Sequence, residues 1–222
     1  PNGAGKTTVF NLLSGIYKPT SGKIFFEGRD VTQYKTFQFA QLGISRTFQN
    51  IRLFSNLSVL QNVLIASNRQ ADYNFVAAML RLPRYKRQEM ELRDKTMELL
   101  RKVNLDMRAK EIARNLPYGH QRRLEIVRAL ATNPKLLLLD EPAAGMNPQE
   151  SLELVEFIRW IKQKFNLTIL LIEHHMDVIM EISDYIVVLN FGKTIARGNK
   201  DEIQENPEVI QAYLGTQEEN NA

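Results

Sequence analysis

Residues 1–8 read Pro1-Asn2-Gly3-Ala4-Gly5-Lys6-Thr7-Thr8, which matches the phosphate-binding motif G-x-x-x-x-G-K-[ST] except for its first glycine. The glycines of such a loop let successive backbone N–H groups turn toward phosphate oxygens, and the helix that follows adds the positive end of its dipole. We predict that Lys6 reaches the β- and γ-phosphates and that the hydroxyl of Thr7 ligates Mg²⁺. The motif therefore predicts a nucleoside-triphosphate site.

The residues after this motif predict a helix. Val9, Leu12 and Leu13 recur at helical spacing, and Gly15 is a typical stop. Because the first glycine of the motif is absent, we expect the protein to extend further upstream and the strand that feeds the phosphate loop to lie there. That strand would anchor the loop, so we expect this segment alone to fold poorly and to hydrolyse little nucleotide.

The composition limits the fold class and the partners. With 222 residues, 44% of them hydrophobic, the chain fits one large α/β domain with a smaller subdomain. A net charge of +4, from 29 basic and 25 acidic residues, gives no strong field for nucleic acid, so we expect no nucleic-acid partner. The absence of cysteine excludes disulfides and thiolate chemistry. No apolar run approaches the roughly 18 residues that a membrane helix needs.

Two apolar runs, residues 136–139 and 168–172, are typical of buried parallel strands. A segment of helical periodicity joins them, so together they predict a β-α-β unit. A strand and turn are expected at 23–29, a strand end and loop at 45–50, and a hairpin over 185–196. A last helix is expected to start at Asn206-Pro207 and to stop at Gly215.

The middle of the chain changes to a charged, helical texture. Two apolar faces at helical spacing are separated by Pro83; they consist of Phe75, Ala78, Met79 and Leu82, and of Leu92, Leu99, Leu100 and Val103. We therefore divide the chain into a first part of the nucleotide-binding core (1–67), a helical subdomain (68–131), a second part of the core (132–215) and a frayed tail (216–222).

Asp140-Glu141-Pro142 follows directly on four leucines. In an open parallel sheet ligands bind at the carboxyl ends of the strands, so the two carboxylates are expected at the nucleotide. Asp140 would hold Mg²⁺, directly or through water, opposite Thr7, and Glu141 would orient or deprotonate the attacking water. Taken alone the pair is equally typical of an acidic cap on a buried strand; with the lysine loop it indicates phosphoryl transfer.

The next strand is followed by Glu173-His174-His175, which places a histidine at the same sheet edge. The imidazole of His174 can hydrogen-bond the γ-phosphate or the attacking water and so sense which is present. A metal site on the two histidines is not expected, because neighbouring residues of one strand point to opposite faces and the sequence shows no further ligands nearby.

A third candidate, Leu116-Pro117-Tyr118-Gly119-His120-Gln121-Arg122-Arg123, precedes an amphipathic helix with Leu124, Val127 and Ala131 on one face. A glycine-containing loop at a helix start is a second cradle for an anion. In isolation the stretch is more typical of an ordinary helix entry.

These features occur in the order found in ATP-binding cassette (ABC) ATPases, and essentially the whole chain resembles that family. The matching features are the phosphate loop, Gln49, Leu116–Arg123, Leu136–Glu141, Ala144-Gly145-Met146-Asn147 and His174. The resemblance implies an α/β P-loop NTPase core of the ABC type, with a mostly parallel sheet and an inserted α-helical subdomain. It implies ATP hydrolysis with Mg²⁺.

Members of this family work as nucleotide-sandwich dimers, in which the signature loop of one subunit closes on the ATP of the other. The resemblance implies nucleotide-binding roles for Asn2, Gly3, Ala4, Gly5, Lys6, Thr7, Thr8, Gln49, Gly119 and His120. It implies catalytic roles for Glu141, His174 and Lys6, and Mg²⁺ ligation by Thr7, Gln49 and Asp140. Gln49 would also be the lid residue that links the site to the partner, and Asn147 would lie in the dimer-contact loop.

Within the family, the chain is similar to the ATPase of branched-chain amino-acid importers, the member with an extended helical insert. The segments that carry this likeness are 46–50, 116–119, 143–148 and 207–215. The likeness implies transmembrane permease subunits on which the helical insert docks, a second identical or different ATPase subunit, and a solute-binding protein acting indirectly. It also implies a peripheral location on the cytoplasmic face of the membrane.

The chain departs from the family pattern at two positions. Pro117 stands where the usual signature has a serine, and it offers neither a hydroxyl nor an N–H to the partner's phosphate. We expect weaker but surviving signature function, or a role in an unequal pair of sites. His175 stands where an aspartate commonly follows the switch histidine, and the sequence attaches no consequence to it.

Three alternatives compete with the transport interpretation. A regulatory or non-transport ABC ATPase with weakened hydrolysis is motivated by Pro117. A cassette acting on ribosomes or DNA would predict a second cassette, a long coiled-coil insert or a strong basic patch, none of which this sequence has. A preference for GTP is not expected, because Asn199-Lys200-Asp201-Glu202 has glutamate where a guanine-reading motif has aspartate.

Overall fold

The computed structural model describes residues 1–67 and 83–212. In these ranges the strands form three sheets. The middle sheet is parallel, in the order β3-β4-β5, and consists of Ile44–Arg46, Leu136–Asp140 and Thr168–Ile172. The other two are antiparallel hairpins, made of β1 (Phe25–Phe26) with β2 (Arg29–Asp30) and of β6 (Ile186–Asn190) with β7 (Lys193–Gly198). The predicted α/β class and the parallel pairing are confirmed.

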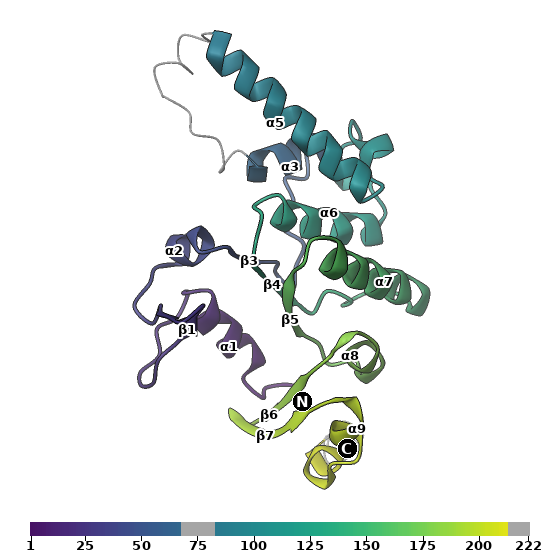
Figure 1. Cartoon of the computed structure of the whole chain (residues 1–222). Coiled ribbons are helices and arrows are strands. Elements are labelled where there is room, and N and C mark those ends of the chain that lie inside the picture. Colours follow the sequence, from purple (N-terminus) through teal and green to yellow (C-terminus); the bar gives the residue numbers. More distant parts are fainter. Residues whose placement is uncertain (68–82, 213–222) are drawn as a thin grey trace.

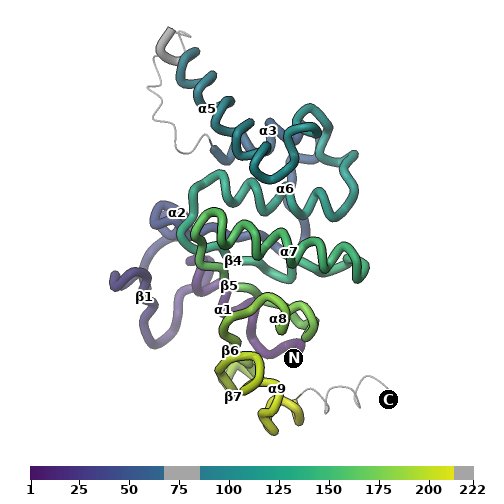
Figure 2. Tube along the Cα trace, turned by 45° about the vertical axis from the view of Figure 1, so that its right-hand side comes forward, coloured from purple at the N-terminus to yellow at the C-terminus, as the bar shows by residue number. Residues whose placement is uncertain are grey.

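Helices lie on both sides of the middle sheet. In Figure 1, α6 (Tyr118–Leu130) lies above it, α7 (Pro148–Lys164) lies to its right and α1 (Lys6–Leu13) lies below; Figure 2 shows these helices from another side. Three shorter helices complete this part: α2 (Thr36–Gln41) beside β3, α8 (Met176–Ile182) after β5, and α9 (Lys200–Gln204) against β7. Residues 207–212 form the start of the predicted last helix.

This arrangement explains why four leucines stand in a row in β4. Successive side chains of a strand point to opposite faces, and a strand covered on both faces needs apolar residues throughout. Leu137 and Leu139 join the core that α6 and α7 complete, whereas Leu138 packs with Phe10 of α1 on the other face. The carboxyl end of β4, which delivers Asp140, is thus fixed by packing from both sides.

A helical arm projects from the α6 side of the molecule (Figure 1). It contains α3 (Val59–Ser67), α5 (Pro83–Lys102) and two 3₁₀ turns, Asp106–Arg108 and Ala113–Asn115. Leu100 and Val103, from the second of the two predicted apolar faces, are buried in the same core as α3. The first predicted apolar face, from Phe75 to Leu82, lies outside the described residues.

Two helices were not predicted, and the buried face of α1 differs from the predicted one. α2 and α3 were not expected, although Ser58 and Gln61 carry the signal for the start of α3: each accepts a hydrogen bond from the other's backbone N–H. In α1 the residue buried in the core is Phe10, and Val9 is exposed.

Across residues 1–67 and 83–212, no helix is both long and apolar enough to cross a membrane.

Candidate active site

The phosphate loop has the backbone that its sequence predicts. Gly3 and Gly5 have φ of 72° and 95°, in the left-handed region that glycine adopts at little cost, and α1 starts directly at Lys6. The Lys6 ammonium donates to the carbonyl of Pro1 at 2.6 Å, and the N–H of Gly192 in the β6–β7 turn donates to the carbonyl of Ala4 at 3.0 Å. The loop is therefore closed on itself and tied to the hairpin.

The remaining loop residues differ in exposure. Ala4 is buried, whereas Asn2, Gly3, Thr7 and Thr8 are exposed. The Thr7 hydroxyl is thus open to a ligand. This pattern is what a loop that presents backbone and side-chain groups outward requires.

Asp140, the last residue of β4, forms a buried ion pair with Arg46 at the end of β3. The guanidinium Nη2 and the carboxylate Oδ2 are 2.8 Å apart, and the two side chains are 8% and 7% exposed. Arg46 also donates to the Asn11 side chain of α1 at 2.7 Å and to the Ser14 hydroxyl at 3.0 Å. Arg46 therefore joins both strand ends to the helix that follows the phosphate loop, a role that the sequence analysis did not foresee.

We expect Asp140→Asn to lower the free energy of unfolding by about 3 kcal/mol, because Arg46 would stay buried without its anionic partner. The loss stays near the low end of the range for a broken buried pair because the Asn11 and Ser14 acceptors remain. Urea unfolding measures it. The matched control is Asp30→Asn, since Asp30 forms an exposed pair with Lys23 and should leave stability nearly unchanged. Equal losses in both variants would contradict the role given to the buried pair.

Glu141 lies between Gln49 and His174 in the site. Its φ is 43°, unusual for a residue other than glycine, while its N–H still donates to the carbonyl of Ile172 at 2.9 Å. The Gln49 amide nitrogen donates to its Oε2 at 2.7 Å, and Nδ1 of His174 lies 3.6 Å from its Oε1. The structure thus brings together three residues that the sequence analysis selected separately.

The histidine doublet corrects one argument made from the sequence. β5 ends at Ile172, so Glu173, His174 and His175 do not alternate as strand residues do. The two imidazole rings lie 4.1 Å apart, and the ligand atoms of all three side chains lie within 4.8 Å of one another. Both premises against a metal site at the doublet, opposite faces and no ligand nearby, were wrong.

Glu173 itself has a positioning task. Its carboxylate is fully buried and accepts the N–H of Ala143 at 3.0 Å, the N–H of His174 at 3.2 Å, and Nδ1 of His175 at 3.3 Å. These bonds tie the turn after Glu141 to the backbone that presents His174. The side chain of His175 packs on this anchor, which is the consequence that the sequence could not supply.

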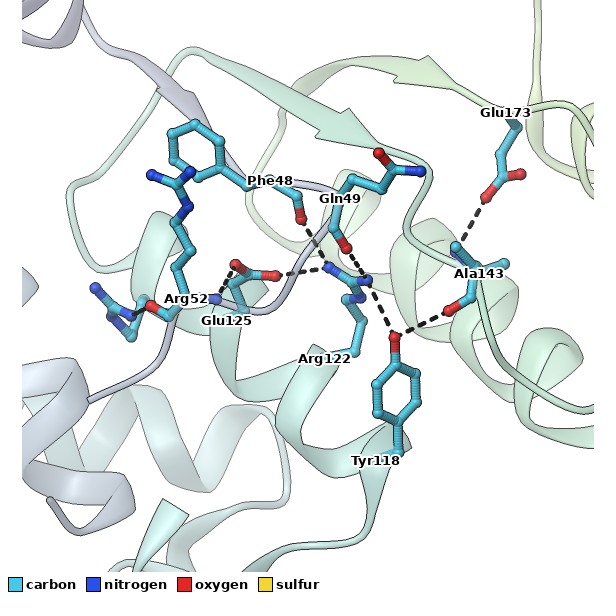
Figure 3. Close-up of polar contacts among 10 residues, drawn as sticks. Phe48, Gln49, Arg52, Tyr118, Arg122, Glu125, Ala143 and Glu173 are labelled. Carbon is cyan, nitrogen blue, oxygen red and sulfur yellow. Dashed lines mark hydrogen bonds and ion pairs between the residues drawn. The ribbon is translucent and has the colours of Figure 1, made fainter. Parts of the chain in front are cut away.

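The predicted signature loop lies beside the turn at 143–147 of the same chain. The Tyr118 hydroxyl donates to the carbonyl of Ala144 at 3.0 Å (Figure 3), and a Cβ on Gly119 would lie 3.8 Å from the Glu150 carboxylate. Asn147 caps α7 through the N–H of Glu150. Burial lowers the pKa of His120, and Arg108 and Arg123 lower it further, so this imidazole is neutral at pH 7.

The selected residues therefore fall into three groups. Gln49 and His174 each lie against the Glu141 carboxylate. Gly119, His120 and Asn147 lie along the starts of α6 and α7. Lys6 shares with Glu173 the lining of a cavity of about 620 Å³ between α1, β5 and β6. Sequence reasoning missed Arg46, Arg122, Glu125 and Glu173. The first three contact groups more than 70 residues away in the sequence, and Glu173 stands beside the more obvious His174.

Two family models match the chain. The model described as ABC transporter matches residues 1–144, and the model described as branched-chain amino acid ATP-binding cassette transporter matches residues 193–219.

Curated relatives match over nearly the whole chain. BraF, a high-affinity branched-chain amino acid transport ATP-binding protein of Pseudomonas aeruginosa, is 46% identical over 97% of this chain and 84% of its own length. LivG of Salmonella typhimurium, of the same description, is 47% identical with the same coverage. The crystal structure of the ADP conformation of MJ1267, an ATP-binding cassette of an ABC transporter, superposes with a TM-score of 0.82 at 30% identity, over 97% of this chain and 85% of that one.

Proposed function

Since the chain belongs to the ABC transporter family of ATPases, we propose that it is the ATP-hydrolysing subunit of an importer of branched-chain amino acids. The substrate class rests on relatives named for branched-chain amino acid transport at 46% and 47% identity, and on the family model that matches residues 193–219. The observation that carries the enzymatic part is the cluster of Gln49, Glu141 and His174 at the carboxyl ends of β4 and β5.

The residues proposed for Mg²⁺ fit that ion in kind. Thr7, Gln49 and Asp140 offer hydroxyl, amide and carboxylate oxygens, the hard ligands that Mg²⁺ prefers. Because Oδ2 of Asp140 is engaged by Arg46, we propose that Asp140 acts on the ion through water. When bound, Mg²⁺ neutralises charge on the β- and γ-phosphates.

In the proposed mechanism the chain's own groups position the water and stabilise the transferred phosphoryl group. Lys6 exchanges its bond to the Pro1 carbonyl for the phosphates, while N–H groups of residues 2–8 surround them. Glu141 accepts the proton of the attacking water or orients it, and Gln49 holds the Glu141 carboxylate in place. His174, already 3.6 Å from Glu141, contacts the γ-phosphate.

We further propose a dimer that closes around two nucleotides. Gly119 and His120 of one subunit would face the ATP of the other, and Asn147 would lie at the contact between subunits. The neutral state of His120 suits a position that donates a hydrogen bond without adding a second charge. The insert at residues 68–114 would dock on transmembrane permease subunits at the cytoplasmic face of the membrane, and a solute-binding protein would deliver the amino acid to those permeases.

Pro117 gives a test of the signature loop. It is the N-cap of α6 and makes no capping hydrogen bond. We expect Pro117→Ser to stabilise the protein by about 1 kcal/mol through the cap. We also expect it to raise ATP turnover about 5-fold, because one neutral hydrogen bond to the partner's phosphate is worth about 1 kcal/mol. Thermal unfolding and a steady-state ATPase assay measure the two effects. A stabilised variant with unchanged turnover would contradict the proposed contact.

The transport function is tested by uptake of radiolabelled leucine into proteoliposomes that contain the chain, its permeases and the solute-binding protein. We expect uptake that requires ATP inside the vesicle and that unlabelled isoleucine and valine suppress, whereas unlabelled lysine does not. ATP hydrolysis without uptake of any of these would favour the regulatory or non-transport alternative, which Pro117 motivates.

A further inference from the structure

Arg122 and Glu125 form a buried ion pair on α6 that the mechanism above does not use. The guanidinium Nη1 and the carboxylate Oε2 are 2.8 Å apart, and the side chains are 0% and 6% exposed. Burying two charges is costly unless their remaining hydrogen-bonding groups also find partners. The other hydrogen bonds of Arg122 and Glu125 therefore show which part of the chain this pair holds in place.

Apart from the Tyr118 hydroxyl, to which Arg122 Nη2 donates at 3.5 Å, those partners belong to the backbone of one loop. Arg122 donates to the carbonyl of Phe48 at 2.9 Å and to that of Gln49 at 2.7 Å, and Glu125 accepts the N–H of Arg52 at 3.0 Å. Figure 3 shows the guanidinium between Glu125 and the two carbonyls. Only a planar fork of donors meets three acceptors in this way, which explains an arginine rather than a lysine.

The start of the same loop is attached to the sheet instead. Arg46 pairs with Asp140, and the N–H of Thr47 donates to the carbonyl of Leu138 at 2.9 Å. The loop is therefore attached to the sheet up to Thr47 and to α6 from Phe48 onward. Gln49, whose side chain donates to Glu141, follows directly on this change.

A second contact links α6 to the turn on the other side of Glu141. Tyr118 donates to the carbonyl of Ala144, and the N–H of Ala144 donates to the carbonyl of Glu141 at 3.1 Å. α6 therefore holds both backbone segments that flank the Glu141 side chain. A shift of α6 relative to β3 and β4 must act on the Gln49–Glu141 contact.

We propose that Arg122 and Glu125 are a positioning pair, which fixes the Gln49 loop to α6 and thereby makes the placement of Glu141 depend on the position of that helix. This inference rests on the proposed function only in taking Glu141 and Gln49 to act on ATP. It assigns to the pair the coupling between the helix after the signature loop and the hydrolytic centre.

The test replaces the pair by apolar residues of similar size, Arg122→Met/Glu125→Leu, so that no buried charge is left unpaired. The matched control is Arg159→Met/Glu181→Leu, which removes an ion pair between α7 and α8 away from the loop. Hydrogen exchange over residues 48–54 should become at least about 10-fold faster in the first variant and stay unchanged in the control, because the Arg52 N–H loses its acceptor. Unchanged hydrogen exchange would contradict the proposal that the pair fixes the Gln49 loop to α6, whatever the activity of the protein.

The coupling is tested by combining that variant with Gln49→Ala in the complex with its permeases. We expect the pair variant alone to lower kcat by about 10- to 100-fold with KM for ATP within about 2-fold, since the phosphate loop is untouched. If the pair acts through Gln49, the combined variant should be no worse than about 2- to 3-fold below the poorer single variant. Losses that multiply, or a pair variant with full kcat, would overturn the proposal. A wild-type protein without ATP turnover would instead refute the proposed function. The hydrogen-exchange measurement would then still test whether the pair fixes the loop to α6.

Discussion

Glu141→Gln is expected to lower kcat by about 10²- to 10⁴-fold while leaving ATP affinity nearly unchanged. The amide keeps the size of the side chain and an oxygen acceptor for the Gln49 amide, so the local packing stays intact. What it loses is the ability to take a proton from the attacking water. Single-turnover hydrolysis and nucleotide binding, measured on the same preparation, separate the two quantities.

Because ATP stays bound and unhydrolysed, the Glu141→Gln protein should also form a stable ATP-dependent dimer, which size-exclusion chromatography detects. Glu156→Gln serves as the control, because Glu156 is an exposed carboxylate in the middle of α7, away from Gly119, Asn147 and the ends of β4 and β5. Turnover of Glu141→Gln at the wild-type rate would remove this residue from its assigned role.

Lys6→Met is expected to weaken ATP binding and to lower kcat/KM by about 10²- to 10³-fold, because a preorganised positive charge at the developing phosphate charge is lost. The bond from Lys6 to the Pro1 carbonyl is lost as well, so thermal unfolding must be measured beside the kinetics. The control is Lys162→Met: Lys162 lines the same cavity but pairs with Asp184 at the surface. Equal losses of kcat/KM in both variants would show a general charge effect rather than a phosphate contact.

The parts of the site that the sequence predicted are those in which local chemistry and strand packing act together. Gly3, Gly5 and Lys6 need only a few neighbouring residues to form their loop. The leucines of β4 are apolar on both faces because α1 and α6 cover both faces, and this forces the next residues, Asp140 and Glu141, to the sheet edge. His174 lies at the same edge because it follows the carboxyl end of β5, the parallel neighbour of β4, although β5 is less buried than predicted, with Leu170 38% exposed.

The parts that could not be predicted depend on pairing across long stretches of sequence. Arg46 meets Asp140 across 94 residues, and Arg122 meets the carbonyl of Phe48 across 74. No periodicity marks such partners, because each residue alone fits a solvated position on a strand or helix. The error at the histidine doublet had a different cause: the alternation rule was applied beyond Ile172, where the strand ends.

The roles of Glu173 and Tyr118 were hidden for a third reason. Both stand next to residues with stronger chemical signals, His174 and Gly119, and their contacts are with backbone groups. The structure indicates that these neighbours fix the geometry that the more obvious residues use.

The central claim is that Lys6, Glu141 and His174 act on one terminal phosphate. The direct measurement is a crystal structure of the Glu141→Gln protein with ATP and Mg²⁺. We predict that Lys6 Nζ and an imidazole nitrogen of His174 lie within about 3.2 Å of γ-phosphate oxygens, with the side chain at position 141 facing the same phosphorus across one water. A γ-phosphate more than about 6 Å from any of the three side chains would contradict the account.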